Sequence, residues 1–285
     1  MQKIREQVHL YILGVLFIAT CLIWYAVFRE DRAGVLTVAF LNVGQGDGIF
    51  IESPTSNQIM IDGGPDGSVL RELGSVMPFY DRSLDMLIVS NPDQDHFGGF
   101  IDILKSYAVD SVVEPGTVGA SSEYSLLEKE IVDKDITHML ARRGQKILIG
   151  GGAEVDILFP DRDVSGMATN DGSIVAKLVY GNTSVLLTGD SPQNIEHYLS
   201  ANDGKNLKST ILKIGHHGSR TSTSAELVGF VAPSYAVISD GKGNTYGHPH
   251  KETLDTLAQF DVPVLRTDLL GAIIFTSDGN EFRQK

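Results

Sequence analysis

Cysteine is almost absent from this 285-residue chain, in which Cys21 is the single one. One cysteine excludes an internal disulfide framework and any zinc site built on several thiolates, so metal chemistry would have to use His, Asp and Asn. Positive charge is also scarce, because 23 Lys and Arg face 36 Asp and Glu, for a formal net charge of −13. That balance argues against a generally basic nucleic-acid-binding surface, although it leaves room for a locally basic cleft.

Long linkers, internal repeats and low-complexity tracts are lacking after the N-terminal segment. Hydrophobic residues make up 42% of the sequence and charged residues 21%, which is ordinary for a folded protein and excludes global disorder. The length suffices for one large domain or two small ones with a sizeable core. With no linker to split it, we expect one domain over residues 35–285.

The longest apolar run lies at the N-terminus, where residues 8–28 read VHLYILGVLFIATCLIWYAVF, with no formal charge except a possible one on His9. This run matches the roughly 20 residues that a helix needs to cross a bilayer core, and Trp24 and Tyr25 suit an interfacial position. A cleaved signal peptide would need a shorter apolar region and a small-residue cleavage site, and a lipoprotein signal at Cys21 would not be followed by more apolar residues. A buried core helix would sit oddly before a short charged linker. We expect an uncleaved single-pass membrane anchor.

The expected layout is therefore a short N-terminal segment (1–7), the anchor (8–28), a linker (29–34) and the domain. Lys and Arg are equally frequent on the two sides of the anchor, so the positive-inside rule leaves its orientation open. With so short an N-terminus, an extracytoplasmic domain is the preferred arrangement.

Hydrophobic patterning in the domain predicts strands first and then strands that alternate with helices. VLTVAFLNV (35–43) and GIFIES (48–53), separated by the turn-prone GQGD, predict paired strands. Residues 173–190 predict a hairpin over Gly181-Asn182. Further strands are expected at 58–64, 85–90, 210–219, 234–239 and 271–277, and helices at 100–107, 191–200, 224–231 and 251–260. This order favours an α/β layered fold with a mixed or largely antiparallel sheet.

Metal-type side chains gather where these apolar runs end, which is where α/β folds place their sites. They follow five separate runs: Asp62; Asp93, Asp95 and His96; Asp190; His216 and His217; His248 and His250. Carboxylate oxygens and imidazole nitrogens are ligands for Zn²⁺, Mn²⁺ and iron, and two such ions a few ångströms apart suit hydrolysis with a metal-bound water as nucleophile. In such a pair, Asp190 would be the bridging carboxylate.

Each of these loops also has a simpler interpretation. The 91–102 segment has acidic and amide residues at EF-hand spacing, but His96 stands where that loop requires glycine, and a strand precedes it. Asp62 could serve turn chemistry, and Asp190 could satisfy backbone donors at a helix N-terminus. The simpler interpretations together require five separate loops to carry metal-type residues by chance, so a metal site is the preferred interpretation.

Six segments, in this order, resemble the metallo-β-lactamase superfamily: FLNVGQGDGIF, IDGG, SNPDQDHFGG, LLTGD, LKIGHHGS and NTYGHPH. Within it they are similar to the hydrolase domains of ComEC-type DNA-uptake proteins, over about residues 35–280. The resemblance implies an αββα four-layer sandwich with a site for two divalent metal ions, Mn or Zn, at one edge of the sheets. It also implies metal-dependent phosphodiester hydrolysis, with single-stranded DNA as the substrate.

The resemblance also assigns roles to individual residues. Metal ligands are expected at Asp93, Asp95, His96, Asp190 and His216. Catalysis, including protonation of the leaving group, is expected from Asp95, His217 and His248, and His216 and His217 could exchange their roles. Substrate contacts are expected at Ser219, Asn244, Tyr246 and His250. Ligand loops would be oriented from behind by Asp47, Asp62 and Asn91. A locally positive edge is expected from Lys213, Arg220 and Lys242.

Two positions depart from the family pattern. Asn91 stands where His-x-Asp-x-Asp-His has its first histidine, and Asn42 replaces the aspartate of the usual Asp-Val-Gly. An amide oxygen binds Zn²⁺ weakly, so three outcomes are open: an enzyme that uses Mn²⁺ or Mg²⁺, a centre with one firmly held metal, or lost catalysis. The last would leave a non-catalytic module that binds nucleic acid or a partner. A small ester or lactone hydrolase of the same fold is the other alternative.

Related domains of this family belong to long polytopic membrane proteins, whereas one span is expected here. Two arrangements fit that difference. A separate membrane channel could be the partner of this chain, or the chain could act as a stand-alone envelope hydrolase.

Overall fold

A computed structural model describes the backbone of residues 2–30 and 34–285, and within the first helix the side chains of residues 9–25. The chain divides into two units, residues 1–33 and residues 34–285. The first unit holds α1 (Gln2–Glu30), which contains the expected anchor. The ends of that expected span (side chains 8 and 26–28) and linker residues 31–33 lie outside the described part. Among the described residues, no helix has both the length and the apolar character needed to cross a membrane, so the anchor is not confirmed.

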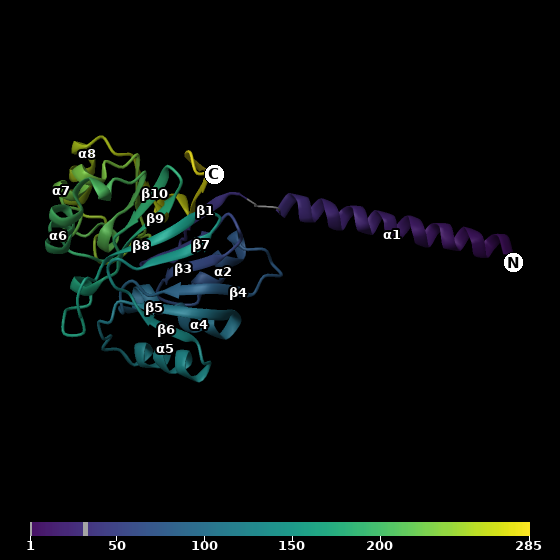
Figure 1. The fold of residues 1–285 in the computed structure, drawn as a ribbon, viewed down its shortest axis with the longest axis horizontal. Helices are drawn as coiled ribbons and strands as arrows, with labels where there is room; N and C mark the ends of the chain where they lie inside the picture. The colour runs from purple at the N-terminus through teal and green to yellow at the C-terminus, as the bar shows by residue number, and fades with distance from the viewer. Residues whose placement is uncertain (1, 31–33) are drawn as a thin grey trace. The chain divides into compact units, whose positions relative to one another are not determined.

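The second unit is built on two β-sheets (Figure 1). The first sheet has eight strands in the order β15-β14-β1-β2-β3-β4-β5-β6. Their bounds are β1 Leu36–Phe40, β2 Gly48–Glu52, β3 Gln58–Gly63, β4 Ser83–Ile88, β5 Ala108–Glu114, β6 Thr137–Leu140, β14 Ile273–Ser277 and β15 Phe282–Gln284. The strands from β3 to β6 run parallel, and the others pair antiparallel.

The second sheet has seven strands in the order β13-β12-β11-β10-β9-β8-β7. Their bounds are β7 Lys146–Gly150, β8 Ala153–Phe159, β9 Val175–Tyr180, β10 Thr183–Leu187, β11 Ile211–Lys213, β12 Tyr235–Ile238 and β13 Val264–Arg266. The strands from β10 to β13 run parallel, and those from β7 to β10 form an antiparallel meander. Each sheet is therefore mixed, with one parallel half.

Helices cover the outer face of each sheet. Next to the first sheet lie α2 Ser68–Val76, α3 Gln94–Phe97, α4 Phe100–Ser106 and α5 Ser122–Asp133, and next to the second lie α6 Gln193–Asp203, α7 Ala225–Val231 and α8 Lys251–Gln259. A short helix, α9 (Thr267–Leu270), follows β13, and 3₁₀ turns lie at η1 Asn170–Gly172, η2 Gly204–Leu207 and η3 Gly215–Gly218. Figure 1 shows α6, α7 and α8 far from α4 and α5, on the other side of the sheets.

The period-two alternation of the strands explains the layers, because successive side chains point to opposite faces of a sheet. In β1, Val38 and Phe40 belong to the core between the two sheets, whereas Ala39 packs with the helices of the first sheet. Phe40 meets Phe275 edge to face, with ring centroids 6.4 Å apart. The expected αββα sandwich is confirmed.

The parallel halves determine where the functional loops meet. The carboxyl ends of parallel strands lie at one edge of a sheet, so the loops after β3 and β4 are neighbours, as are those after β10, β11 and β12. The expected strand over 210–219 is too long. It ends at Lys213 and turns into η3, which carries the two histidines of the GHHG motif.

Residues 108–159 hold elements that no predicted run covers. The edge strand β6 is exposed at all its positions, and β7 is partly exposed, so no apolar alternation marks them in the sequence. β6 is an end strand of the first sheet, and β7 is an end strand of the second.

A candidate metal centre at the strand ends

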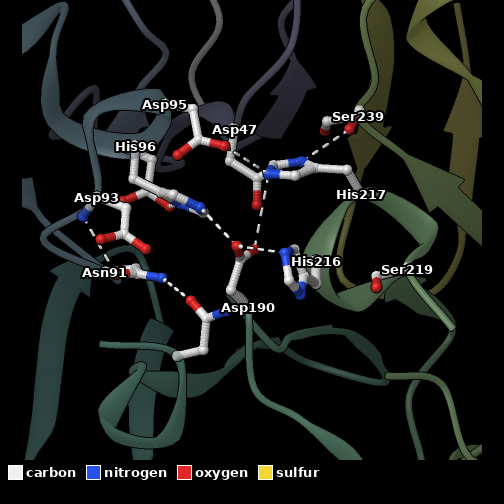
Figure 2. Close-up of polar contacts among 12 residues, drawn as sticks. Asp47, Asn91, Asp93, Asp95, His96, Asp190, His216, His217, Ser219 and Ser239 are labelled. Atoms are coloured by element: carbon white, nitrogen blue, oxygen red, sulfur yellow. Dashed lines mark hydrogen bonds and ion pairs between the residues drawn. The ribbon is translucent and has the colours of Figure 1, made fainter. Parts of the chain in front are cut away.

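The loops after β3, β4, β10 and β11 bring their polar side chains together at one edge (Figure 2). Three of these residues have a backbone conformation that non-glycine residues rarely adopt, with φ of 56° at Asp62, 49° at His216 and 54° at His217. Such conformations are costly and are concentrated at functional sites. The fold therefore holds this edge in a strained arrangement.

His96 is fixed by a buried carboxylate behind it. Asp62 accepts hydrogen bonds from the backbone N–H of Ser90 at 2.7 Å and from His96 Nδ1 at 2.8 Å. Because Nδ1 donates to Asp62, Nε2 is the nitrogen turned toward the cluster, and it lies 3.2 Å from Asp190 Oδ2. His96 is fully buried, and its Nε2 has no hydrogen-bond partner among the described residues. This is the arrangement of a metal-binding imidazole oriented by a carboxylate.

His217 is held in the same way on the opposite side. Its Nδ1 lies 3.0 Å from the carbonyl oxygen of Ser239, and since a carbonyl can only accept, Nδ1 is the donor. Nε2 therefore faces the cluster, 3.2 Å from Asp95 Oδ2 and 3.7 Å from Asp190 Oδ1. Two imidazole nitrogens and two carboxylates thus converge on a common space from three loops.

Donor atoms of Asp95, His96 and His217 lie within 4.8 Å of one another, and Asp190 contacts both histidines. Burial raises the pKa of Asp190, but His96 and His217 outweigh burial and hold that pKa far below its usual range. Burial lowers the pKa of His217, while Asp190 and Asp47 raise it to about 10. The carboxylates of this cluster concentrate negative charge, and its imidazole nitrogens are themselves metal ligands. Both features fit a divalent metal ion.

The neighbouring histidine of the GHHG motif takes a different position. His216 Nε2 lies 3.8 Å from Asp190 Oδ2, and its Nδ1 lies 3.2 Å from the Thr221 hydroxyl. His216 belongs to none of the donor clusters found among the described residues. The geometry therefore favours His217 as the ligand and leaves His216, the residue expected from the resemblance, on the wall beside it.

Asp93 also lies outside the donor clusters found among the described residues, and the Asn91 side chain faces a neighbouring loop. The Asp93 carboxylate accepts a hydrogen bond from the Thr169 hydroxyl at 2.9 Å, and Asn91 is fully buried in contact with Asn170. Asp93 was expected to be a metal ligand, and its carboxylate thus already accepts a hydrogen bond from the loop before β9.

Lys213 corrects an expectation. Predicted to make the edge positive, it is fully buried, and its Nζ lies 2.7 Å from both oxygens of Asp47. Burial raises the pKa of Asp47, but Lys213 and His217 together lower it well below its usual range. The burial of Lys213 could have been predicted from the alternation of β11. Lys213 is two residues after Ile211 and therefore lies on the same face of the strand, toward the core between the sheets.

A solvent-open pocket of about 320 Å³ leads to the cluster. Its lining residues are Gln45, Asp93, Gln94, Asp95, Asp190, His216, His217, Tyr246 and His248. Tyr246 is 67% exposed, and its ring stacks on His248 with centroids 5.8 Å apart. Of the four residues expected to contact substrate, Tyr246 is the one that lines this pocket.

The other three expected substrate contacts brace the loops. The Asn244 side chain accepts from the His248 N–H at 3.0 Å and donates to the His248 carbonyl at 2.7 Å. Ser219 is buried, bonds to the Thr221 hydroxyl and lies apart from the cluster in Figure 2. His250 Nδ1 accepts the backbone N–H of Arg220 at 3.2 Å.

His248 differs from the buried histidines in its protonation. Burial, together with the neighbouring histidines of the site, lowers the pKa of His248 to about 4. At neutral pH His248 is therefore uncharged and accepts protons rather than donating them. Its Nδ1 is buried without a hydrogen-bond partner among the described residues.

Sequence comparison decides the family. Residues 41–239 match the family model of the metallo-beta-lactamase superfamily. The chain belongs to this superfamily. Among curated proteins it is 32% identical over 254 residues to ComE operon protein 3 of Bacillus subtilis, covering 83% of this chain and 32% of that protein. It is 30% identical over 242 residues to competence protein ComA of Neisseria gonorrhoeae, covering 84% and 32%.

The expected resemblance to ComEC-type competence proteins is confirmed, and the chain spans about a third of the length of these relatives. Among solved structures, the metallo-β-lactamase fold protein YhfI of Bacillus subtilis aligns with a TM-score of 0.58 at 12% identity, covering 85% of this chain and all of that one. That similarity shows the fold. The metallo-β-lactamase fold and the clustered His and Asp donors together imply binding of a divalent metal.

Proposed function

We propose that this metallo-β-lactamase domain is a metal-dependent phosphodiesterase that cleaves single-stranded DNA. The observation that carries the proposal is the pair of imidazoles, His96 and His217, whose Nδ1 atoms are bound from behind while both Nε2 atoms face Asp95 and Asp190. A divalent cation held by these four side chains would supply Lewis-acid activation of water and of the phosphate.

The charge of the pocket makes the cation necessary for binding as well as for chemistry. Three carboxylates, from Asp93, Asp95 and Asp190, line it, and no Lys or Arg of the described residues does. A phosphodiester anion entering this space would be repelled unless a cation offset the carboxylates. This pocket therefore offers no favourable site for a phosphate without its metal.

Residues of the pocket wall supply the proton transfers. His248 is neutral at neutral pH and can accept a proton at the face of the pocket. His216, whose ring centroid lies 5.6 Å from that of His248, is the second wall histidine. Asp95, with its side chain about one-third exposed, lies at the boundary between the buried donors and substrate.

Single-stranded DNA is proposed because one of the matched relatives is named a competence protein and because Tyr246 presents an exposed ring in the lining of the pocket. A base can stack on such a ring, whereas a duplex has no unstacked base to offer. A separate membrane channel is proposed as the partner of this domain in DNA uptake, because the matched relatives include a competence protein. Membrane attachment through residues 8–28 and an extracytoplasmic site stay predictions of the sequence.

The test is hydrolysis of a fluorescent single-stranded oligonucleotide by the full chain with Mn²⁺. Asp190→Ala is expected to abolish turnover, because it removes the carboxylate that contacts both buried histidines. Asp110→Asn, at an exposed position of β5, is the matched control and should retain wild-type turnover. Unchanged turnover in Asp190→Ala would contradict the proposal.

Asn91 favours a second candidate, a binding module without catalysis, because it removes one family ligand. This candidate predicts that the chain retains the oligonucleotide on a native gel but does not cleave it at any Mn²⁺ concentration. Cleavage of a lactone panel with none of DNA would instead select the small-ester hydrolase.

A further inference from the structure

Asn91 occupies the family's first ligand position, and both polar atoms of its side chain make hydrogen bonds. Its Oδ1 accepts the backbone N–H of Asp93 at 3.1 Å, and its Nδ2 donates to Asn170 Oδ1 at 2.7 Å. The backbone N–H fixes the orientation, since a flipped amide would set two donors against each other. The amide oxygen, the one atom of Asn91 that could ligate a cation, is therefore turned toward the backbone.

Asp93, the next ligand of the family pattern, is held by the same loop. The Thr169 hydroxyl donates to Asp93 Oδ2, and Thr169 directly precedes η1, which begins at Asn170. This loop is tied to the site by the Ile174 N–H, which donates to the Ser90 carbonyl at 2.8 Å. Two adjacent residues of one loop thus engage both side chains that would define a second metal position.

Asp47 does not replace these ligands, although it lies within a cluster with Asp190 and His217. The Lys213 ammonium contacts both of its oxygens at 2.7 Å inside the core. A second cation on Asp47 would lie beside that buried positive charge, where repulsion is strong because the surroundings are of low dielectric.

What is left is one complete donor set: Asp95, His96, Asp190 and His217. Two imidazoles and two carboxylates satisfy the four-ligand preference of Zn²⁺ and leave room for water with Mn²⁺. We propose that this centre holds one divalent cation, and that the Asn91–Asn170 and Asp93–Thr169 hydrogen bonds occupy the place of the second. The inference rests on the proposed function in taking a divalent metal as the group bound here.

The experiment is metal binding without substrate, on the full chain. After treatment with chelator and dialysis, the chain is titrated with Mn²⁺, and bound metal is counted by elemental analysis while the electron paramagnetic resonance spectrum is recorded. The wild type is expected to bind one Mn²⁺ per chain with the hyperfine pattern of an isolated ion. Two equivalents with a broadened, spin-coupled signal would overturn the inference.

A variant tests the hydrogen bonds themselves. Asn91→His combined with Asn170→Ala restores an imidazole and removes its competing partner, so bound Mn²⁺ should double and spin coupling should appear. Asn280→His, which adds a histidine at an exposed position outside the pocket lining, is the matched control and should bind one ion. If the double variant has a wild-type circular dichroism spectrum and still binds one ion, these hydrogen bonds are not what closes the second position.

These outcomes separate the inference from the proposed function. One bound Mn²⁺ with no hydrolysis of DNA would leave the inference standing and remove the phosphodiesterase. Two bound Mn²⁺ with hydrolysis of DNA would do the reverse.

Discussion

Asp62→Asn removes one charge behind the centre and is expected to reverse the protonation of His96. The Ser90 N–H will still require an oxygen at 2.7 Å, so the new amide must turn its NH₂ group toward His96 Nδ1. Nδ1 then becomes an acceptor, which puts the proton on Nε2 and blocks the lone pair that faces Asp190. Loss of such a carboxylate partner lowers metal affinity by about 10- to 100-fold, which corresponds to about 1.4–2.8 kcal/mol.

The assay is competition for Mn²⁺ between the full chain and a fluorescent chelator, at equal protein concentration. Asp110→Asn makes the same chemical change on the exposed face of β5 and should bind as the wild type does. Circular dichroism of the metal-free variants checks that Asp62→Asn remains folded. A folded Asp62→Asn chain with wild-type affinity would refute the claim that Asp62 sets the tautomer of His96.

Three further predictions concern buried charges and are measured by urea unfolding of the metal-free chain. Lys213→Met leaves the buried Asp47 carboxylate without its lysine partner, so the free energy of unfolding should fall by about 3–5 kcal/mol, and adding Asp47→Leu should recover most of the loss. Glu196 accepts two backbone N–H groups at 2.6 Å, so Glu196→Gln should cost about 1–3 kcal/mol, because an amide oxygen can serve only one side of that pair. Burial raises the pKa of Asp240 to about 6 although Arg266 opposes it. An acid raised in this way stabilises the fold below its ordinary pKa and loses that stabilisation as pH rises through about 6. Relative to Asp240→Asn, the wild type should therefore lose about 2–3 kcal/mol between pH 4 and pH 7, and parallel pH profiles would contradict this.

The sequence predicted the types of candidate ligand and the loops that hold them, because the ends of apolar runs and the polar residues that follow can both be recognised in the sequence. Asp95, His96 and Asp190 follow apolar runs, and the structure brings them to one edge. The choice between His216 and His217 was not predictable, because both have a left-handed backbone and the turn of η3 decides which ring faces inward.

Other misses have equally local causes. Lys213 looked like a surface charge by residue type, but strand alternation places it in the core opposite Asp47. Asn244 bonds to the backbone of His248 with both ends of its side chain, and its expected contact with substrate stays a prediction. The braces on Asn91 and Asp93 come from a loop about 80 residues along the chain, and no spacing rule links positions so far apart.

The most direct test of the account is the rate of single-stranded DNA hydrolysis measured against the number of Mn²⁺ ions bound to the chelator-treated full chain. The account predicts no hydrolysis without metal, a rate that rises in proportion to the first bound ion, and a plateau once Asp95, His96, Asp190 and His217 are occupied. Hydrolysis that survives removal of the metal, or a fully loaded chain that cleaves no DNA, would contradict it.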